Sequence, residues 1–290
     1  MLNEIYYNKA GDEFYTKFSN IEKELSNYNL AGKKVYCNCD HPSHSAFCKY
    51  FSQNYEALGL AGLFASSTWG GDGAFVFDGT EWNDLFSRSG RFQDNMHLMR
   101  ECDIIVTNPP FSDKQTHQMI KMALACGKDF ILVGPIHLIL NGEMLELFKQ
   151  GRLNAGYTSI SWFSTQDGGS KSMPTMWWTS VNVPKPELHT GVTGATETLP
   201  DGTLYAKTYK DIPDDYNGPI SVPYSFCRHI NKNQFEILGI KKQDIGGKMS
   251  TRMIITRGDK YFSEETKKGK DVGKKIRLTE RDFHRAIKEW

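Results

Sequence analysis

Long apolar segments are scarce in this sequence of 290 residues. The longest run covers 11 residues, 130–140, and is interrupted by Gly134, Pro135 and His137. A helix that spans a bilayer takes about 20 apolar residues, so we expect none here. The first residues also show no basic stretch followed by an apolar one, which is the pattern of a secretory signal. We therefore expect a cytoplasmic protein with no membrane-spanning segment.

The sequence also lacks Cys-x-x-Cys pairs, and its six cysteines are scattered. One cluster within 12 residues holds five side chains of metal-binding type: Cys37, Cys39, His41, His44 and Cys48. Zinc ligands usually occur in pairs about two to four residues apart on a turn. Here the first two cysteines are expected inside a strand and the last one in a helix. We therefore predict reduced cysteines in the core and no metal site.

An excess of charge of one sign is absent, because the net charge is only +1. This balance hides an asymmetry: residues 241–290 carry 15 Lys and Arg against 8 Asp and Glu, a net charge of +7, and the first 240 residues carry −6. A basic segment on a mildly acidic body favours phosphate contacts, although charge alone fits a solvated helix face equally well. The 39% hydrophobic and 24% charged residues exclude disordered, collagen-like and coiled-coil chains.

Strand-like apolar runs alternate with helical patterns over the first 150 residues. The predicted strands are Lys34–Cys39, Leu63–Ser67, Ala74–Phe77, Asp103–Thr107 and Phe130–Gly134. The predicted helices are Ser45–Leu58, Asp94–Arg100, Ser112–Cys126 and Leu138–Lys149. This alternation predicts an α/β fold with a mostly parallel sheet that is covered by helices on both faces.

Two further strands are predicted without a helix between them, Tyr157–Ser164 and Thr175–Val183. A glycine-rich loop, 166–170, joins them, so we expect an antiparallel hairpin at one edge of a seven-stranded sheet. From about residue 184 proline, glycine and threonine become frequent. The sequence therefore predicts two domains, an α/β domain over residues 1–183 and a smaller, irregular region over residues 184–290.

One motif carries chemistry: the strand 103–107 leads directly into Asn108-Pro109-Pro110-Phe111, and a helix follows. In open α/β sheets ligands bind at the carboxyl ends of the strands. Two prolines fix φ and remove two N–H groups, so that carbonyl oxygens are presented on a stiff loop. The Asn108 side-chain oxygen and the Pro109 carbonyl suit the two hydrogens of an exocyclic amine, and Phe111 offers a flat face to a planar base. The plainer interpretation is a Pro-Pro turn with a buried Phe111.

The quartet resembles the catalytic motif of S-adenosylmethionine-dependent amino-methyltransferases, and Asn-Pro-Pro-Phe in particular resembles the adenine-N6 DNA methyltransferases. Three further stretches are similar to the EcoRI-type adenine methyltransferases, many of which bacteria or phages carry: 12–16, 37–40 followed by Pro42, and 105–112. The resemblance spans roughly residues 5–183 in order and spacing. It implies a Rossmann-like methyltransferase fold, S-adenosyl-L-methionine as the methyl donor and a role in restriction-modification.

The resemblance also implies the roles of individual residues. Around the methionine end of the methyl donor it places Phe14, Tyr15 and Thr16, with Asp40 and Asn108 beside the donor. Asn108 and Pro109 then hold the target amine on the rigid loop that Pro110 completes, and Phe111 stacks on the flipped base. The plainer interpretation of Asp40 is an N-cap or turn residue, and that of Tyr15 is a surface or core aromatic.

The sequence departs from this family's pattern in three places, one of which is the second strand, where residues 65–68 supply no acid for a ribose diol. The glycine-rich loop usual after the first strand is replaced by Asp-His-Pro-Ser-His-Ser at 40–45. The family's Gly-Asp-Phe before the catalytic strand corresponds to Gly-Arg-Phe at 90–92. Either Asp72 or Asp94 is the acid that fills this role, and the sequence leaves the choice open.

The predicted function is therefore site-specific transfer of a methyl group from S-adenosyl-L-methionine to the N6 amine of adenine in double-stranded DNA, with the base flipped out of the duplex. Contacts to DNA are expected from the basic residues around a Gly246-Gly247 turn, and the basic stretch 267–275 fits DNA contacts and a solubilising loop equally well. The first group comprises Lys241, Lys242, Lys248, Arg252 and Arg257. We expect a monomer, because an asymmetric enzyme can act on one strand at a time.

The same features allow three other interpretations. The acceptor is RNA or a protein glutamine in the first, although phenylalanine after the two prolines and the basic C-terminal segment favour DNA. The second is a catalytically inactive nucleic-acid-binding relative, which the intact Asn108 opposes and the atypical 40–45 loop favours. The third, a Rossmann-type oxidoreductase, is disfavoured because no Gly-x-Gly-x-x-Gly follows the first strand.

Overall fold

The protein is described by a computed structural model. The described residues are 14–67, 73–85, 95–110, 113–165, 168–191, 197–213 and 216–258. They fall into two compact units. The first unit comprises the described residues up to Pro135 together with Gly156–Val181, and the second comprises Ile136–Ala155 and the described residues from Asn182 to 258. No helix in these described ranges is long and apolar enough to cross a membrane.

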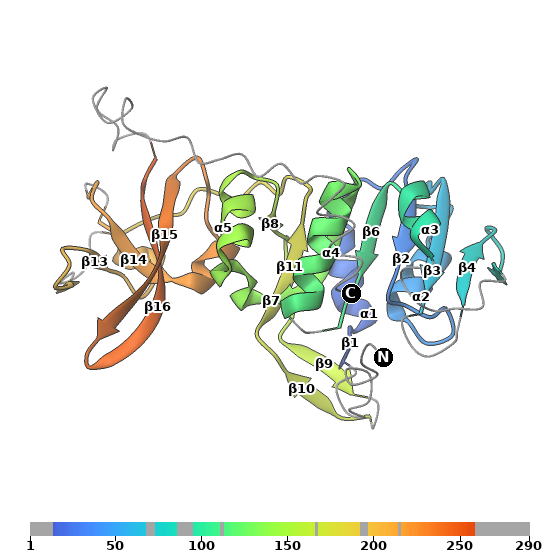
Figure 1. Ribbon diagram of the computed structural model, residues 1–290, viewed down its shortest axis with the longest axis horizontal. Helices are drawn as coiled ribbons and strands as arrows, with labels where there is room; N and C mark the ends of the chain where they lie inside the picture. Colours follow the sequence, from blue (N-terminus) through green and yellow to red (C-terminus); the bar gives the residue numbers. More distant parts are fainter. Residues whose placement is uncertain are drawn as a thin grey trace, which may run out of the picture. The chain divides into compact units, whose positions relative to one another are not determined.

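A large mixed sheet forms the centre of the first unit (Figure 1). Within this unit seven strands run in the order β5-β4-β3-β2-β6-β7-β11. Their bounds are Trp82–Asp84 (β5), Ala74–Phe77 (β4), Gly62–Ser66 (β3), Lys34–Cys37 (β2), Ile104–Thr107 (β6), Asp129–Pro135 (β7) and Thr175–Thr179 (β11). The central four, β3, β2, β6 and β7, are parallel, whereas β4, β5 and β11 pair antiparallel. The carboxyl ends of the parallel strands therefore meet at one edge of the sheet.

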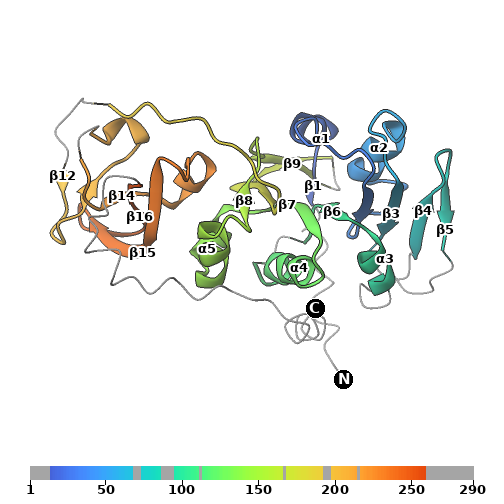
Figure 2. The same cartoon turned by 90° about the horizontal axis from the view of Figure 1, so that it is seen from above.

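Helices cover both faces of this sheet, as predicted. Their bounds are Phe18–Leu25 (α1), Ala46–Gln53 (α2), Met96–Glu101 (α3) and Asp113–Ala125 (α4). Figure 2 shows α1 and α2 on one face and α3 and α4 on the other. Because both faces are covered, every residue of β6 is buried, which explains why this strand is an unbroken apolar run. Tyr36, Phe51, Phe130 and Trp177 are among the largest fully buried side chains of the core.

The predicted antiparallel hairpin at the sheet edge is wrong. The glycine-rich loop instead joins β9 (Trp162–Thr165) to β10 (Ser170–Ser172) in a separate three-stranded sheet with β1 (Phe14–Tyr15). The strand β11 pairs antiparallel with β7 in the large sheet. The reason is burial: all residues of β10 are polar and exposed, whereas Thr-Met-Trp-Trp-Thr of β11 is buried throughout and needs a strand position covered on both faces.

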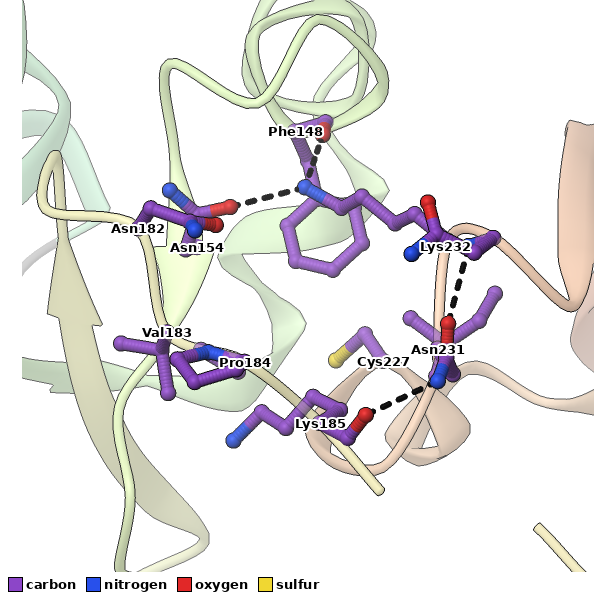
Figure 3. Close-up of a pocket in the computed structure, with 12 residues that line it drawn as sticks. Phe148, Asn154, Asn182, Val183, Pro184, Lys185, Cys227, Asn231 and Lys232 are labelled. Atoms are coloured by element: carbon purple, nitrogen blue, oxygen red, sulfur yellow. Dashed lines mark hydrogen bonds between the residues drawn. The ribbon is translucent and has the colours of Figure 1, made fainter. Parts of the chain in front are cut away.

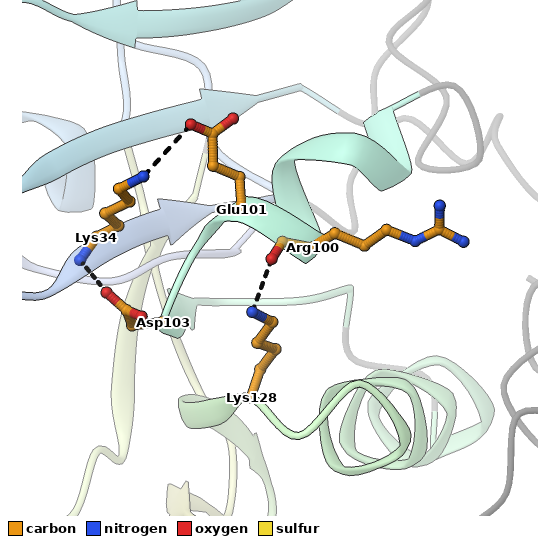
Figure 4. A network of polar contacts seen from close by, with 5 residues as sticks. All are labelled: Lys34, Arg100, Glu101, Asp103 and Lys128. Atoms are coloured by element: carbon orange, nitrogen blue, oxygen red, sulfur yellow. Dashed lines mark hydrogen bonds and ion pairs between the residues drawn. The ribbon is translucent and has the colours of Figure 1, made fainter.

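Polar contacts join the amino ends of the strands at the opposite edge of the same sheet. The Lys34 backbone N–H donates to Asp103 Oδ2 over 2.8 Å, and Lys34 Nζ lies 3.5 Å from Glu101 Oε1. Lys128 Nζ donates to the Arg100 carbonyl over 2.7 Å. Figure 4 shows that these contacts join the start of β2 to the residue before β6, and the starts of β2 and β7 to the end of the helix Met96–Glu101. The exposed ion pair contributes only about 0–1 kcal/mol to stability.

The second unit contains a five-stranded sheet, and the prediction of an irregular region is wrong. The strand order is β12-β13-β14-β16-β15, with bounds Glu197–Thr198 (β12), Leu204–Tyr205 (β13), Ile220–Pro223 (β14), Lys248–Arg257 (β16) and Phe235–Ile245 (β15). β15 and β16 form a long antiparallel hairpin. Its two-residue turn is Gly246-Gly247, with φ of 60° and 84°, the left-handed conformation that a type I′ turn requires.

The remaining elements of this unit are short. The predicted helix over 138–149 is divided into a 3-10 helix, Ile136–Leu140, and α5, Gly142–Lys149. The division falls at Asn141, whose side chain caps α5 by accepting the backbone N–H groups of Glu143 and Met144. The other elements are β8 (Asn154–Ala155) and two 3-10 helices, Tyr209–Asp211 and Tyr224–Arg228.

Candidate active site

Two loops meet at the carboxyl edge of the first unit's sheet: residues 38–45 after β2 and residues 108–110 after β6. β2 and β6 are parallel neighbours, so their ends lie side by side. Thr107, the last residue of β6, donates its hydroxyl to Asp40 Oδ2 over 2.5 Å. The structure therefore brings together two of the predicted site residues, Asp40 and Asn108, with Thr107 as the link between their loops.

Asp40 is a buried carboxylate whose two oxygens each accept a hydroxyl. Besides the bond from Thr107, its Oδ1 accepts from Ser45 Oγ over 2.6 Å, and its exposed fraction is only 7%. Burial raises the pKa of Asp40 to about 6, against the opposing effect of the two hydroxyl donors. The N-cap of α2 is Ser45, whose Oγ accepts the Phe47 and Cys48 N–H groups, so that Asp40 is not the cap.

The motif loop begins at the rim of this edge. Pro109 is buried, while Asn108 and Pro110 are half-buried. Thr107, just before them, is fully buried, so the chain passes from the interior to partly exposed positions within one residue. The helix α4 begins at Asp113, directly after the motif. Phe111, like both candidate acids Asp72 and Asp94, lies outside the described residues.

The N-terminal segment reaches the loop that follows β2. β1 holds Tyr15 opposite Ser164 of β9, and the Tyr15 ring contacts the His44 ring edge-on, with 6.3 Å between centroids. Thr16 is buried, and its Oγ1 has no hydrogen-bond partner among the described residues. For Phe14 the backbone is described, but the side chain lies outside the described set.

Two stacked imidazoles lie in the loop after β2, within residues 40–45, which differs from the glycine-rich loop of the resembling enzymes. The His41 and His44 rings are parallel to within 4° and 5.1 Å apart, and Ser43 Oγ lies 2.7 Å from His41 Nδ1. The His41 ring also meets Phe75 of β4 edge-on at 4.9 Å. Within the described ranges no three His, Cys, Asp or Glu side chains gather in a metal-binding group. Burial raises the pKa of the Cys37 and Cys39 thiols.

Four residues of this region were missed by sequence reasoning: Thr107, Ser45, Asn38 and Glu24. Asn38 is fully buried beside α4, where its Nδ2 lies 3.0 Å from Met119 Sδ, and its Oδ1 has no partner in the described part of the chain. Thr107 and Ser45 carry a weak sequence pattern, a hydroxyl at the end of a strand and at the start of a helix. Only the fold reveals that they converge on one carboxylate.

Glu24 fixes the segment that leads into β9. Its carboxylate, on α1, is fully buried and accepts the Tyr157 N–H, the Thr158 N–H and the Thr158 hydroxyl at 2.6–2.8 Å. The Tyr28 hydroxyl donates to the same carboxylate over 2.8 Å. Because β9 pairs with β1, this anchor also determines where Tyr15 lies. A lone glutamate in an amphipathic helix gives no hint of this role.

The basic residues predicted to contact DNA divide into two groups in the second unit. Lys241, Lys242 and Lys248, the hairpin lysines, are exposed on β15 and β16. Arg252 is buried, and its guanidinium donates to the carbonyls of Ala206 and Ser221.

The prediction for Arg252 is therefore wrong, because its donors already satisfy buried carbonyl groups inside the sheet. The Tyr205 ring lies 4.8 Å from this guanidinium and stabilises the charge. Arg257 likewise donates to Thr190 Oγ1 and to the Pro213 carbonyl, at 2.7 and 3.0 Å. The basic stretch 267–275 lies outside the described residues.

The second unit also has a polar cavity of about 250 Å³, shown in Figure 3. Lys232 Nζ lies in its wall and donates to the carbonyls of Phe148 and Leu153 and to Asn154 Oδ1, at 2.5, 3.4 and 2.9 Å. Burial lowers the pKa of Lys232 to about 8. Since all three ammonium protons have acceptors, this lysine caps the carboxyl end of α5 and has no donor to offer a ligand.

Comparison with known proteins shows to which class of enzyme the chain belongs. The family model for the adenine-specific methyltransferase EcoRI matches residues 2–83 and 70–181. The chain belongs to this family, and it is an adenine-specific methyltransferase.

Individual relatives agree with this family. The chain is 30% identical over 286 residues to the type II methyltransferase M.EcoRI of Escherichia coli, covering 80% of this chain and 86% of the relative. It is 28% identical over 272 residues to M.MgeORF184P of Mycoplasma genitalium and 28% identical over 273 residues to M.MpnI of Mycoplasma pneumoniae. Each of these two matches covers 80% of this chain and 85% of the relative. No solved structure matches the chain.

Proposed function

We propose that this chain is a site-specific DNA methyltransferase that transfers a methyl group from S-adenosyl-L-methionine to the N6 amine of adenine in double-stranded DNA. The observation that carries the proposal is the Asn108-Pro109-Pro110 loop at the carboxyl end of β6, joined through Thr107 to the buried Asp40 at the end of β2. Family membership and three relatives that are type II methyltransferases support it.

The proposal includes a Rossmann-like methyltransferase core. Its support is the parallel set β3-β2-β6-β7 with the antiparallel strand β11 beside β7 and helices on both faces. We assign catalysis to residues 1–183 and DNA recognition to residues 184–290. The protein then acts as a cytoplasmic monomer, as the modification enzyme of a restriction-modification system.

We assign the binding of the methyl donor to five residues: Phe14, Tyr15, Thr16, Asp40 and Asn108. When bound, S-adenosyl-L-methionine supplies the methyl group as an electrophilic carbon on a sulfonium. The residues fit such a group, because hydrogen-bonding capacity is left over in this region: the buried Asp40 carboxylate accepts two hydroxyls and has further lone pairs, and the Thr16 hydroxyl is buried with no partner in the described ranges. An ammonium and ribose hydroxyls are the donors that such acceptors need.

Asn108 and Pro109 hold the target amine in this proposal. The Asn108 side-chain oxygen and the Pro109 carbonyl accept the two amine hydrogens, which draws the nitrogen lone pair out of conjugation and aims it at the methyl carbon. Pro110 keeps the loop stiff, and Phe111 stacks on the flipped base, an interaction worth about 1–3 kcal/mol. Positioning and electrostatics then supply most of the rate acceleration.

The β15–β16 hairpin is the proposed DNA-contacting element. β14 pairs with β16 only from Arg252 to Ile255, and from 241 to 251 β15 and β16 pair with each other without a third strand among the described residues. Figure 1 shows the hairpin extending past the other strands of its sheet. A two-stranded ribbon fits the major groove of B-DNA, and the hairpin lysines suit its phosphates. The exposed Lys241–Asp201 pair, 3.6 Å long, is weak enough to exchange for phosphate.

Identifying the methyl acceptor and the methylated product tests the proposal. The purified chain is incubated with methyl-labelled S-adenosyl-L-methionine and, separately, unmethylated duplex DNA, RNA or a protein mixture, and the modified nucleosides are identified by mass spectrometry. We expect label only in DNA, as N6-methyladenine at one recurring sequence. Label in RNA or in protein glutamine would overturn the choice of substrate. Donor binding without transfer to any acceptor would favour the inactive relative.

A further inference from the structure

Three buried side chains form a hydrogen-bonded network at the carboxyl edge of the first unit's sheet. The Thr107 hydroxyl donates to Asp40 Oδ2, and the Ser45 hydroxyl donates to Asp40 Oδ1. All three residues are buried, with exposed fractions of 0%, 7% and 7%. The Asp40 backbone N–H also donates to the Ser66 carbonyl over 3.0 Å. This network thus connects the end of β6 to β3 and to the first turn of α2.

Stability alone does not explain this arrangement. A buried carboxylate costs free energy unless it is fully compensated, and here its side-chain donors in the described part of the chain are the two hydroxyls. Burial holds the pKa of Asp40 well above its ordinary value. An apolar or amide side chain would avoid that cost. A carboxylate kept under these conditions points to a role in the reaction.

We propose that Thr107 is a positioning residue, which fixes Asn108 relative to the loop after β2 through its hydrogen bond to Asp40. Thr107 precedes Asn108 directly, and Pro109 and Pro110 transmit its backbone position along a stiff loop. A misplacement of about 1 Å at reacting groups costs about 100-fold in rate. The inference rests on the proposed function, because it assigns the positioning to the methyl-transfer step.

The experiment compares Thr107→Val, which keeps the shape and removes the hydroxyl, with Thr107→Ser, which keeps the hydroxyl. Single-turnover transfer to cognate DNA is measured at saturating donor, and the donor Kd is measured separately. We expect Thr107→Val to lower the transfer rate about 10- to 100-fold and to change the donor Kd less than about threefold. Thr107→Ser should stay within about threefold of the wild-type rate.

A double-mutant cycle tests whether the effect passes through Asp40. In the Asp40→Ala background the further effect of Thr107→Val should shrink to less than about threefold. Thr179→Val is the matched control, since Thr179 is a buried strand threonine of the same sheet whose hydroxyl donates to the Phe130 carbonyl over 2.7 Å. It should lower the thermal midpoint and leave the transfer rate unchanged.

Three results would overturn the inference or its basis. Wild-type rates in Thr107→Val, or a loss of equal size with and without Asp40, would refute the positioning role while leaving the proposed function intact. A wild-type chain that transfers no methyl group to adenine in DNA would refute the proposed function and this inference with it. If Thr107→Val does not fold, as judged by circular dichroism, Thr107→Ala takes its place in the same cycle.

Discussion

Asp40 offers a quantitative prediction, because a carboxylate that is costly to bury gives stability a definite pH dependence. Burial raises its pKa to about 6 from an ordinary value of 3.8, so the folded state binds the proton more tightly than the unfolded state. The contribution of Asp40 to stability therefore falls as the pH rises from about 4 to about 6, and then stays low. At about 1.4 kcal/mol per pH unit, the loss approaches 3 kcal/mol above pH 6.

Asp40→Asn removes this charge and keeps the shape of the side chain. At pH 7.5 we expect this variant to be more stable than the wild type by about 1–3 kcal/mol, with the advantage shrinking toward zero near pH 4. Methyl transfer should fall at least about tenfold in the same variant, since the amide cannot accept both hydroxyls as the carboxylate does. A gain in stability combined with a loss of activity is typical of a functional site.

The assay is urea-induced unfolding at several pH values between 4 and 8. Asp201→Asn is the control, because hydrogen bonds from Thr203 and Gln243 lower the pKa of Asp201 to about 2. That carboxylate contributes stability that is fully present above about pH 4, so its variant should be less stable by a constant amount over this range. If Asp40→Asn is less stable than the wild type at pH 7.5, with the same pH profile, the reasoning about Asp40 is refuted.

Three further perturbations follow from the packing and the charges. Gly156→Ala should destabilise the protein by about 1–3 kcal/mol in urea unfolding, because the added Cβ would meet Glu24 Oε1, whereas Gly142→Ala has open space and should be near neutral. Replacing the three hairpin lysines by Gln should reduce the slope of log K, where K is the DNA association constant, against log salt concentration by about 2 to 3. An unchanged slope would show that these lysines do not contact DNA phosphates. Arg252→Met should lower the thermal midpoint, and a variant that loses only DNA affinity would contradict its structural role.

The central strands could be predicted because a strand that is buried on both faces has an uninterrupted apolar sequence. The sequence predicts β6 from Asp103, one residue earlier than its start at Ile104, and it predicts β4 with its observed bounds, Ala74–Phe77. The position of Asn108 at the carboxyl edge followed from the same pattern, since a polar residue and two prolines end the run. The tertiary consequence, that Asn108 lies next to the loop of Asp40, followed once the two strands were parallel neighbours.

The pairing of later strands could not be predicted, because partners are chosen by burial that only the whole fold reveals. The local sequence does not indicate that β11 pairs with β7 and not with β9, which is nearer in the chain. The sequence predicts the Gly246-Gly247 turn but not the length of the hairpin, because the outer halves of β15 and β16 are polar on both faces, as at Lys241 and Lys242. The Thr107–Asp40 bond joins residues 67 apart in the chain, a separation at which no sequence spacing gives guidance.

The most direct test of the central account is the methyl-transfer step in Asn108→Ala. Donor affinity and the single-turnover rate of N6-methyladenine formation are measured on the same duplex DNA for this variant and the wild type. The account predicts that the donor still binds, with a Kd within about tenfold of the wild type, while the transfer rate falls at least about 100-fold. A transfer rate close to that of the wild type would contradict the assignment of the β6 edge as the site of methylation.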